Sequence, residues 1–426
     1  MNYTSYDMGA YQVYVIPTDR FKRTVIEFDF KKKIEKEDIS YLNFLMAVLL
    51  EGCKKYPTRR TMELASDDLY GMEWSYRTLK SGKYLCLKMS FVFLDEKYTE
   101  EGMLQKSLEM IHDILFDPDV KDGAFPEEKV EFVRSVLLEN LRTFWENQTA
   151  YANLRMLEEM MPDSSISYHP YGEKELLEKI NGKDLYQYYQ KLLKSFLLNI
   201  VVCGNVAGIS YPDILRKLIP INTLKHPGED PMIEQTKFRK RSKTIVETKE
   251  FNQSKLVIGC KVEPLTSFEY QYVMPIYNYL LGGGSDSILF RTVREKHSLC
   301  YTIQSNYQSA VGILKIFAGI EKADFKKAVK LIKDSMKKIE KGNFTEEQIQ
   351  NGILTYTSAY LEITDSPENM IASLINHLNF HTDLCEEKLE NIKKVTKEDI
   401  LKVAKKVHMD TIYLLEGEMK NEEDEA

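Results

Sequence analysis

The 426-residue chain lacks several features that would place it in a common class of protein. It has no apolar run long enough to cross a membrane, and its first residues do not combine the basic and apolar regions of a secretory signal. None of its six cysteines forms a Cys-x-x-Cys pair, which argues against a disulfide framework and a zinc knuckle. The net charge of −7 disfavours general nucleic-acid binding. These absences predict a cytoplasmic protein with reduced thiols and no membrane segment.

Short motifs of several enzyme classes are also missing. No Gly-Lys-Ser/Thr follows the glycines, as a phosphate-binding loop requires, and no Gly-x-Ser-x-Gly marks a nucleophilic serine. His377 and His381 have the i, i+4 spacing of two metal ligands, but Leu378 occupies the position of the base in a His-Glu-x-x-His motif. We interpret them as ordinary helix histidines. An independent enzyme with an unrecognised site around them remains a third hypothesis.

The chain does contain the same order of predicted strands and helices in its first and second halves. Segments typical of strands are predicted in the first half at 11–17, 22–30, 72–79, 83–94 and 196–204. The second half repeats them at 244–249, 255–262, 299–307, 312–319 and 411–417. Amphipathic helical patterns lie between the strands, the longest at 126–160. The pattern predicts two similar α+β units, residues 1–220 and 244–418.

The segments outside these units have a different composition. Residues 221–243 contain two prolines and a basic run, with a further proline immediately before them, and they are predicted to form an exposed linker. The basic run is more typical of a solvated tether than of a surface for an acidic partner. The last residues, 419–426, are predicted to be a disordered acidic tail.

One stretch, residues 282–307, combines a glycine loop, a helix, a turn and a strand. Gly282, Gly283 and Gly284 carry no Cβ, so another backbone can pass close to them. The helix ends near Arg294, and an alternating strand begins near Tyr301. Tyr301 follows Arg294 by seven positions, which allows both side chains to point into one cleft.

Several strings of this stretch together resemble the second half of the insulinase-like (pitrilysin, M16) zinc peptidases. They are the Leu-Gly-Gly-Gly-Ser that begins at Leu281, Val293-Arg294-Glu295-Lys296, and Leu299-Cys300-Tyr301. The resemblance extends over nearly the whole chain. It implies two homologous units, each an antiparallel β-sheet packed with helices.

The resemblance also implies roles for particular residues. Arg294 and Tyr301 match an arginine and a tyrosine that hold the substrate carbonyl, and Gly282–Gly284 would line the path of the peptide. The chemistry is suitable, because a guanidinium and a phenol are good donors to an oxygen that gains negative charge.

Active members of this family carry His-x-x-Glu-His on the first helix of the first unit, shortly before a glycine. Aligning that glycine with Gly52 puts Asn43 and Ala47 at the two histidine positions and Met46 at the glutamate position. Alanine has no ligand atom, methionine cannot accept a proton, and an asparagine amide is a poor zinc ligand. The resemblance therefore predicts a degenerate metal site, and no metal bound by this chain.

The remaining metal ligand of the family is a glutamate on a later helix. The matching stretch contains Glu139 and Asn140, and the alignment favours Asn140 at the ligand position. A shift of one residue would place Glu139 there instead. Either choice leaves too few ligands for zinc.

These observations support two functional hypotheses, which assign the chain to different classes of protein. The first is a non-catalytic subunit, without peptidase activity alone, that completes the peptide chamber of a homologous zinc-bearing partner and supplies Arg294 and Tyr301. In this heterodimer the zinc belongs to the partner, and the substrate is a peptide of limited size. The second is a stand-alone peptide-binding or scaffold protein, for instance a homodimer. Cleavage of a peptide library by this chain, by a partner and by the mixture separates them.

Overall fold

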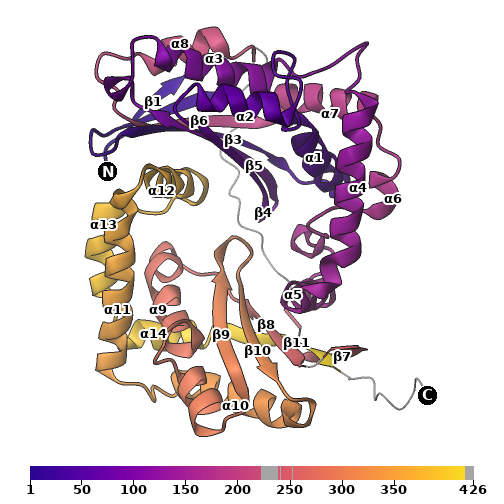
Figure 1. The fold of residues 1–426 in the computed structure, drawn as a ribbon. Coiled ribbons are helices and arrows are strands. Elements are labelled where there is room, and N and C mark those ends of the chain that lie inside the picture. The colour runs from indigo at the N-terminus through magenta and orange to yellow at the C-terminus, as the bar shows by residue number, and fades with distance from the viewer. Residues whose placement is uncertain (222–237, 240, 252, 418–426) are drawn as a thin grey trace, which may run out of the picture. The chain divides into compact units, whose positions relative to one another are not determined.

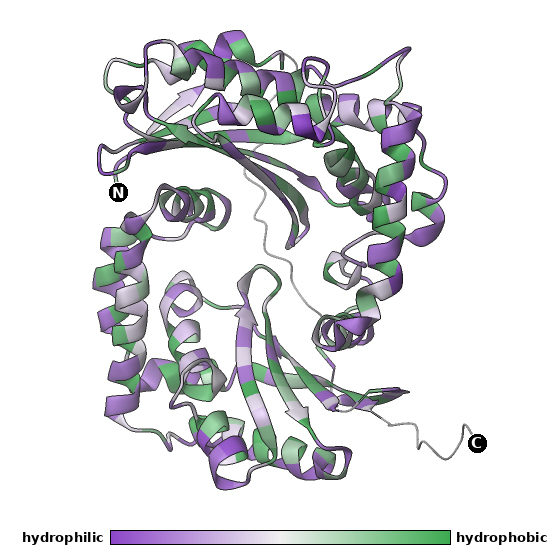
Figure 2. Cartoon of the chain, in the orientation of Figure 1, coloured by the Kyte–Doolittle hydropathy of each residue, from purple (hydrophilic) through white to green (hydrophobic). Residues whose placement is uncertain are grey.

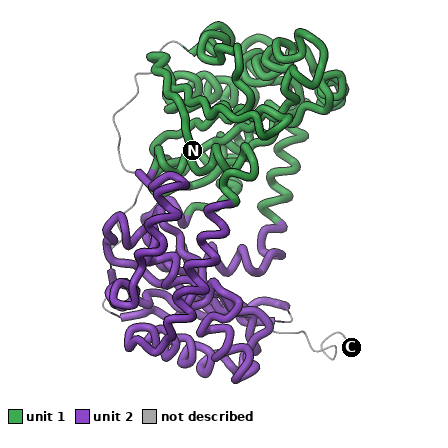
Figure 3. The backbone as a smooth tube through the Cα atoms, turned by 90° about the vertical axis from the view of Figure 1, so that its left-hand side faces the viewer, with its two compact units in different colours: residues 1–142, 168–231, 362–379 green, residues 143–167, 232–361, 380–426 purple. Residues whose placement is uncertain are grey.

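The computed structural model describes residues 1–221, 238, 239, 241–251 and 253–417. Its contacts divide the chain into two compact units, each made of several segments (Figures 1 and 3). Unit 1 contains residues 1–142, 168–231 and 362–379, and unit 2 contains residues 143–167, 232–361 and 380–426. Each unit contains a sheet packed with helices, which confirms the predicted α+β class. Within the described residues, no helix has the length and hydropathy needed to cross a membrane.

The sheet of unit 1 has six strands in the order β1-β2-β6-β3-β5-β4. The strands are β1 (Thr4–Asp7), β2 (Gln12–Pro17), β3 (Arg23–Lys33), β4 (Glu73–Ser81), β5 (Tyr84–Leu94) and β6 (Leu197–Gly204). Neighbouring strands are antiparallel except β2 and β6, which run parallel. β1 was not predicted from the sequence, because it is a short strand with no buried residue.

The sheet of unit 2 has five strands in the order β7-β11-β8-β10-β9. The strands are β7 (Lys243–Lys249), β8 (Ser254–Val262), β9 (Cys300–Gln308), β10 (Ile313–Ile320) and β11 (Val407–Gly417). Only β7 and β11 are parallel. When β1 is left out, the two sheets have the same strand order and the same strand directions. In unit 1 the last strand, β6, lies between β2 and β3, and in unit 2 the last strand, β11, lies between β7 and β8. The repeat read from the sequence is therefore a repeat of topology.

The helices of unit 1 that come from the first half of the sequence cover one face of its sheet (Figure 1). They are α1 (Lys36–Leu49), α2 (Arg59–Asp67), α3 (Met103–Phe116), α4 (Glu127–Thr143), α6 (Lys174–Leu177), α7 (Gly182–Ser195) and α8 (Tyr211–Leu218). Alternate residues of β3, including Phe28 and Phe30, form a core with Leu42 and Phe44 of α1. Because α1 packs on both the sheet and α7, most of its residues are buried. Most of them are also apolar, as the hydropathy colouring shows (Figure 2).

In unit 2 the corresponding core lies between the sheet and a second set of helices. These are α9 (Met274–Asn278), α10 (Phe325–Glu340), α11 (Glu346–Leu361), α13 (Cys385–Asn391) and α14 (Lys397–Ala404). Wider π-helical turns lie on both sides of α9, namely η4 (Glu269–Val273) and η5 (Tyr279–Gly283). Shorter 3-10 turns are η1 (Glu96–Tyr98), η2 (Phe144–Glu146), η3 (Ser165–Ser167), η7 (Ser309–Val311), η8 (Lys322–Asp324), η9 (Glu362–Asp365) and η10 (Ile392–Lys394).

The second face of each sheet is covered by a helix from the other half of the sequence. On the sheet of unit 1 this helix is α12 (Pro367–Phe380), whose Ile371 and Leu374 pack against Val25, Val201 and Ile16. These contacts are mainly apolar. They explain why the strands of this sheet carry buried side chains on both faces.

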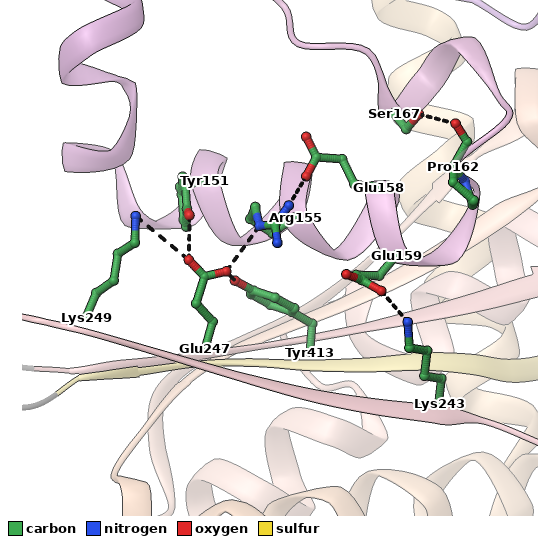
Figure 4. Close-up of polar contacts among 10 residues, drawn as sticks. All are labelled: Tyr151, Arg155, Glu158, Glu159, Pro162, Ser167, Lys243, Glu247, Lys249 and Tyr413. Atoms are coloured by element: carbon green, nitrogen blue, oxygen red, sulfur yellow. Dashed lines mark hydrogen bonds and ion pairs between the residues drawn. The ribbon is translucent and has the colours of Figure 1, made fainter.

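On the sheet of unit 2 the corresponding helix is α5 (Gln148–Met160), which packs Met156 and Met160 on β8 and β11. A polar cluster centred on Glu247 adds to this packing (Figure 4). The Glu247 carboxylate accepts hydrogen bonds from the hydroxyl of Tyr151 at 2.5 Å, the hydroxyl of Tyr413 at 2.6 Å and Nε of Arg155 at 3.1 Å. The carboxylate is thus satisfied by residues of both the helix and the sheet.

The sequence did not indicate these two helix positions. The helix predicted over 126–160 is two helices, since α4 ends at Thr143 and α5 begins at Gln148, and the two belong to different compact units. The units 1–220 and 244–418 therefore remain a prediction about two homologous halves of the sequence. The contacts group residues 143–167 of the first half with unit 2, and residues 362–379 of the second half with unit 1. Most of the predicted linker 221–243, and the tail 419–426, lie outside the described residues.

Candidate functional site

Helix α1 fixes the three positions of the degenerate metal site in unit 1. The backbone N–H of Glu35 donates to Asp38 Oδ2 at 3.0 Å, which caps the start of the helix. The hydroxyl of Tyr188 on α7 donates to Asp38 Oδ1 at 2.9 Å. The first turn of α1 is therefore held in place, and the positions on its next turns follow from the helical geometry.

Asn43 on this helix is buried, and its amide is used within the protein. Its Nδ2 donates to the carbonyl of Pro170 at 2.8 Å, and its Oδ1 accepts from Oγ1 of Thr78 on β4 at 2.6 Å. Both ends of the side chain therefore link α1 to neighbouring elements. Asn43 is a structural residue here, which is a different use from metal binding.

Met46 and Ala47 offer no chemistry for a metal or a water. Met46 is 1% exposed and belongs to the main core of unit 1. Ala47 is half-buried against that core. These side chains do not fit zinc, since alanine has no ligand atom and the thioether of methionine is neither a usual zinc ligand nor a base.

The later helix α4 carries both candidates for the remaining ligand position. Asn140 is half-buried, whereas Glu139 is exposed and forms an ion pair with Arg142, whose Nη2 lies 2.6 Å from Glu139 Oε1. The hydrogen bond from Arg142 lowers the pKa of Glu139 below its ordinary value. No group of three or more His, Cys, Asp or Glu that can hold a metal occurs among the described residues.

The two spaced histidines do not form a site of their own. His377 lies on α12, but α12 ends at Phe380, and His381 has the left-handed backbone angle φ of 52°. The expectation of two helix histidines is therefore wrong for His381. Because the helix does not continue to His381, the i, i+4 spacing does not place the two rings on one helix face.

In unit 2 the glycine loop packs tightly onto the end of α9 and onto β9. A Cβ at Gly282 would lie only 2.8 Å from the backbone nitrogen of Ser305, and a Cβ at Gly284 would lie 2.7 Å from a ring carbon of Tyr279. Oγ of Ser305 also donates to Asn278 Oδ1 at 2.8 Å. The glycines are therefore needed for close packing, as their lack of a Cβ suggested. Gly282 is buried and Gly283 is exposed.

The loop leads into a short helix that presents Arg294. Leu289 and Val293 are fully buried and fix this helix, whose last part is the π-helical turn η6 (Phe290–Lys296). Ser298 then adopts a left-handed conformation, with φ of 51°, and β9 begins two residues later. This sharp reversal brings the end of η6 beside the start of β9.

The structure places the two predicted substrate-binding residues side by side. Cζ of Arg294 lies 4.9 Å from the centre of the Tyr301 ring and 4.6 Å from that of the Phe290 ring. Tyr301 is 78% exposed, an unusual position for an aromatic side chain. Within the described part of the chain, no carboxylate forms an ion pair with Arg294. We refer to Phe290, Arg294 and Tyr301 as the Arg/Tyr corner.

The stacked arrangement leaves the hydrogen-bond donors of the corner available. An arginine that stacks on rings is held in orientation by their faces, while its N–H groups lie in the guanidinium plane and remain free to bind an oxygen. Phe290 was not recognised from the sequence as part of this corner. Its i, i+4 spacing from Arg294 is the signal that indicates it.

Comparison with known proteins agrees with these observations. Residues 179–355 match the family model described as the peptidase M16 inactive domain. A Bacillus subtilis protein named probable inactive metalloprotease YmfF is 27% identical over 418 residues, which cover 96% of each chain. The chain therefore resembles M16 peptidases over nearly its whole length. Another Bacillus subtilis relative, the uncharacterized zinc protease YmxG, is 22% identical over 58% of each chain.

Solved structures share the fold over nearly the whole of this chain. A conserved protein from Enterococcus faecalis has a TM-score of 0.91 at 23% identity, and the match covers 99% of this chain and 100% of that one. A peptidase M16 inactive domain from Pseudomonas fluorescens has a TM-score of 0.80 at 14% identity over 98% of each chain. Together with the side chains at positions 43, 46 and 47, the family match supports a non-catalytic role for this chain.

Proposed function

We propose that this chain is the zinc-less subunit of an M16 peptidase and completes the peptide chamber of a homologous, zinc-bearing partner. The observation that carries the proposal is the Arg/Tyr corner. An exposed tyrosine stacked on an arginine with no carboxylate partner among the described residues serves no evident purpose in stability. The same chain has apolar or hydrogen-bonded side chains at all three positions of the zinc motif.

In this proposal the corner acts on the carbonyl of the peptide bond that is cleaved. The guanidinium of Arg294 and the hydroxyl of Tyr301 donate hydrogen bonds to the carbonyl oxygen, which gains negative charge as the bond is attacked. Stacking on Phe290 orients the guanidinium before the substrate arrives, so little reorganisation is needed. Gly282 packs beneath this corner, and Gly283 and Gly284 line the path of the peptide. The attacking water and its metal belong to the partner.

A second candidate is a peptide-binding or scaffold protein without any peptidase partner. It is favoured by the edge strands β4 and β9, each of which pairs with one strand only in the described sheets. An extended peptide can add to such an edge through backbone hydrogen bonds. This role needs neither zinc nor a second type of subunit.

The deciding experiment compares cleavage of a quenched fluorescent peptide library by this chain, by a homologous subunit with the His-x-x-Glu-His motif, and by their mixture. Activity in the mixture only supports the accessory subunit. Activity of the partner alone that mixing does not change favours the scaffold. Activity of this chain alone that a chelator abolishes would contradict both proposals.

Variants of the corner then test its role within the mixture. Arg294→Ala is expected to lower kcat by about 10²–10³-fold, the usual effect of losing one donor to a developing oxyanion. Tyr301→Phe removes the hydroxyl and keeps the ring. Arg291→Ala is the matched control, because Arg291 lies on the same helical turn and pairs instead with Asp286 at 3.7 Å. If the two corner variants assemble normally and turn over at the wild-type rate, the proposed role of the corner is wrong.

A further inference from the structure

Unit 1 contains a cavity beside the degenerate metal site. Its volume is about 670 Å³, and it lies between the end of α1, helix α2 and the start of β4. Ala47 forms part of its wall, together with Leu50 and Met72. A histidine at position 47 would fill space that the methyl group of Ala47 leaves open.

Charge sets this cavity apart from a larger one in unit 2, which measures about 780 Å³ and whose charged lining residues are mostly basic, among them Arg241, Lys333 and Lys337. In unit 1, Trp74 and Tyr76, both on β4, line the cavity. The Tyr76 phenol is neutral near pH 7, because its ordinary pKa is 10.0 and partial burial raises that pKa further. The two rings therefore offer uncharged aromatic faces to a ligand.

The charges in the unit 1 cavity are mostly negative. Glu51, Glu63 and Glu73 line it, with Arg59 as the one positive side chain among its lining residues. Arg59 is already paired, since its Nε lies 3.1 Å from Glu63 Oε1. Glu51 and Glu73 form no ion pair within the part of the chain that the structure describes. Two carboxylates are therefore left to attract a cation.

We infer that this cavity binds the side chain of a lysine or arginine that a peptide presents. The aliphatic part of such a side chain suits the walls formed by Leu50 and Met72, and its positive end suits the aromatic faces of Trp74 and Tyr76. Glu51 and Glu73 add electrostatic attraction at short range. This inference rests on the proposed function only in taking a peptide as the ligand.

A free polyamine has the same charged groups, so the structure must also favour a peptide. Four consecutive residues of the lining, 73–76, belong to the start of β4. β4 lies at the edge of its sheet, with β5 as its neighbour. A ligand with a backbone can form hydrogen bonds with this edge that a free amine cannot.

The chain provides its own reporter for a binding experiment. It contains two tryptophans, Trp74 and Trp145, so the variant Trp145→Phe leaves Trp74 in the cavity as the single tryptophan. Its fluorescence is recorded during titration with three probes. They are the pentapeptide acetyl-Ala-Ala-Lys-Ala-Ala-amide, the same peptide with norleucine in place of lysine, and spermidine.

We expect a saturable change in Trp74 fluorescence with the lysine peptide, and binding about tenfold weaker or more for the norleucine peptide and for spermidine. The double variant Glu51→Gln/Glu73→Gln should bind the lysine peptide about tenfold or more weaker than the wild type does, and should bind the norleucine peptide with unchanged affinity. The matched control is Glu101→Gln, an exposed carboxylate outside the cavity. Far-ultraviolet circular dichroism verifies that each variant is folded.

Three results would overturn the inference. Equal binding of the lysine and norleucine peptides would mean that the cavity does not select a cation. Spermidine binding as tightly as the lysine peptide, with the same dependence on Glu51 and Glu73, would mean that the ligand is a free amine. No saturable response in a folded protein would mean that the cavity binds none of them. The assay uses this chain alone, so its failure is distinguishable from failure of the Arg/Tyr corner in the peptidase mixture.

Discussion

The side chains at the degenerate zinc positions of helix α1 are buried or half-buried, whereas in the Arg/Tyr corner the tyrosine is exposed and the arginine lacks an ion partner among the described residues. On α1, Asn43 is buried with both ends of its amide hydrogen-bonded, and Met46 is part of the core. In the corner, Tyr301 is 78% exposed, and Arg294 stacks on it with no carboxylate partner in the described chain. The α1 side chains are explained by the stability of unit 1, whereas those of the corner are not.

The same contrast exists within unit 2 between two charged side chains. Glu247 accepts three hydrogen bonds from residues of α5 and β11, so its charge is used in folding. Arg294 has rings beside it and no ion partner among the described residues. A charged group whose partners are complete is structural, and a charged group held in place without partners is available to a ligand.

The largest effect on stability is expected for Met46→Glu. The glutamate would be buried without a partner, and we expect a loss of about 3–5 kcal/mol in the free energy of unfolding, measured by urea denaturation. This loss of stability should become smaller as the pH is lowered. Burial raises the pKa of the new carboxyl, so it becomes protonated at low pH, and the neutral form costs less to bury. Met46→Leu, the volume-matched control, should cost less than about 1.5 kcal/mol. Equal stability of the two variants would show that position 46 is not a core position.

Glu247→Gln should have the next largest effect. An amide cannot accept all the hydrogen bonds that the carboxylate accepts, and hydrogen bonds to charged groups contribute about 1.5–3 kcal/mol. Burial alone would raise the pKa of Glu247, but the hydrogen bonds from Tyr151, Tyr413 and Arg155 outweigh it and lower this pKa below 4.5.

The lowered pKa of Glu247 gives this variant a defined pH dependence. The stabilisation by the carboxylate is present above the unfolded pKa, near 4.5, and is lost as the pH falls through the folded pKa. The difference in unfolding free energy between wild type and Glu247→Gln should therefore be largest near pH 7 and become smaller below pH 4.5. Glu390→Gln, an exposed carboxylate on α13, is the control. A difference that stays constant down to about pH 3 would contradict the assigned role of the charge.

Gly282→Ala tests whether the corner depends on the packing beneath it. A Cβ would lie 2.8 Å from the backbone nitrogen of Ser305, so either the loop or β9 must move. We expect a loss of about 1–3 kcal/mol, as for other overpacked sites, seen as a lower Tm. Ser285→Ala, at an exposed position three residues further on, should leave the Tm unchanged. An unchanged Tm for both variants would mean that the loop has room to relax.

The smallest effect on stability is expected for the corner itself. Tyr301 is 78% exposed and Arg294 has no ion partner among the described residues, so Arg294→Ala and Tyr301→Ala should each change the free energy of unfolding by no more than about 0.5 kcal/mol. Thermal and urea denaturation of the chain alone provide the measurement. Losses above about 2 kcal/mol would show that the corner is needed for folding, and its contrast with α1 would then not hold.

The sequence alone determined the features that depend on neighbouring residues. Alternation of apolar residues predicted the strands that became β2–β11, and the repeated order of elements predicted two similar units, because these patterns follow from local backbone geometry. Asn43, Met46 and Ala47 could be recognised as unable to bind zinc because ligand chemistry is a property of the residue type.

Only the tertiary structure decided which faces these elements cover and which side chains meet. The packing of α5 on the sheet of unit 2 and of α12 on that of unit 1 depends on contacts between residues far apart in the chain, which helical periodicity does not encode. The stacking of Arg294 on Tyr301 depends on the reversal at Ser298. The cavity beside Ala47 exists because α1, α2 and β4 converge there. Periodicity specifies which side of an element is apolar, and packing specifies what that side contacts.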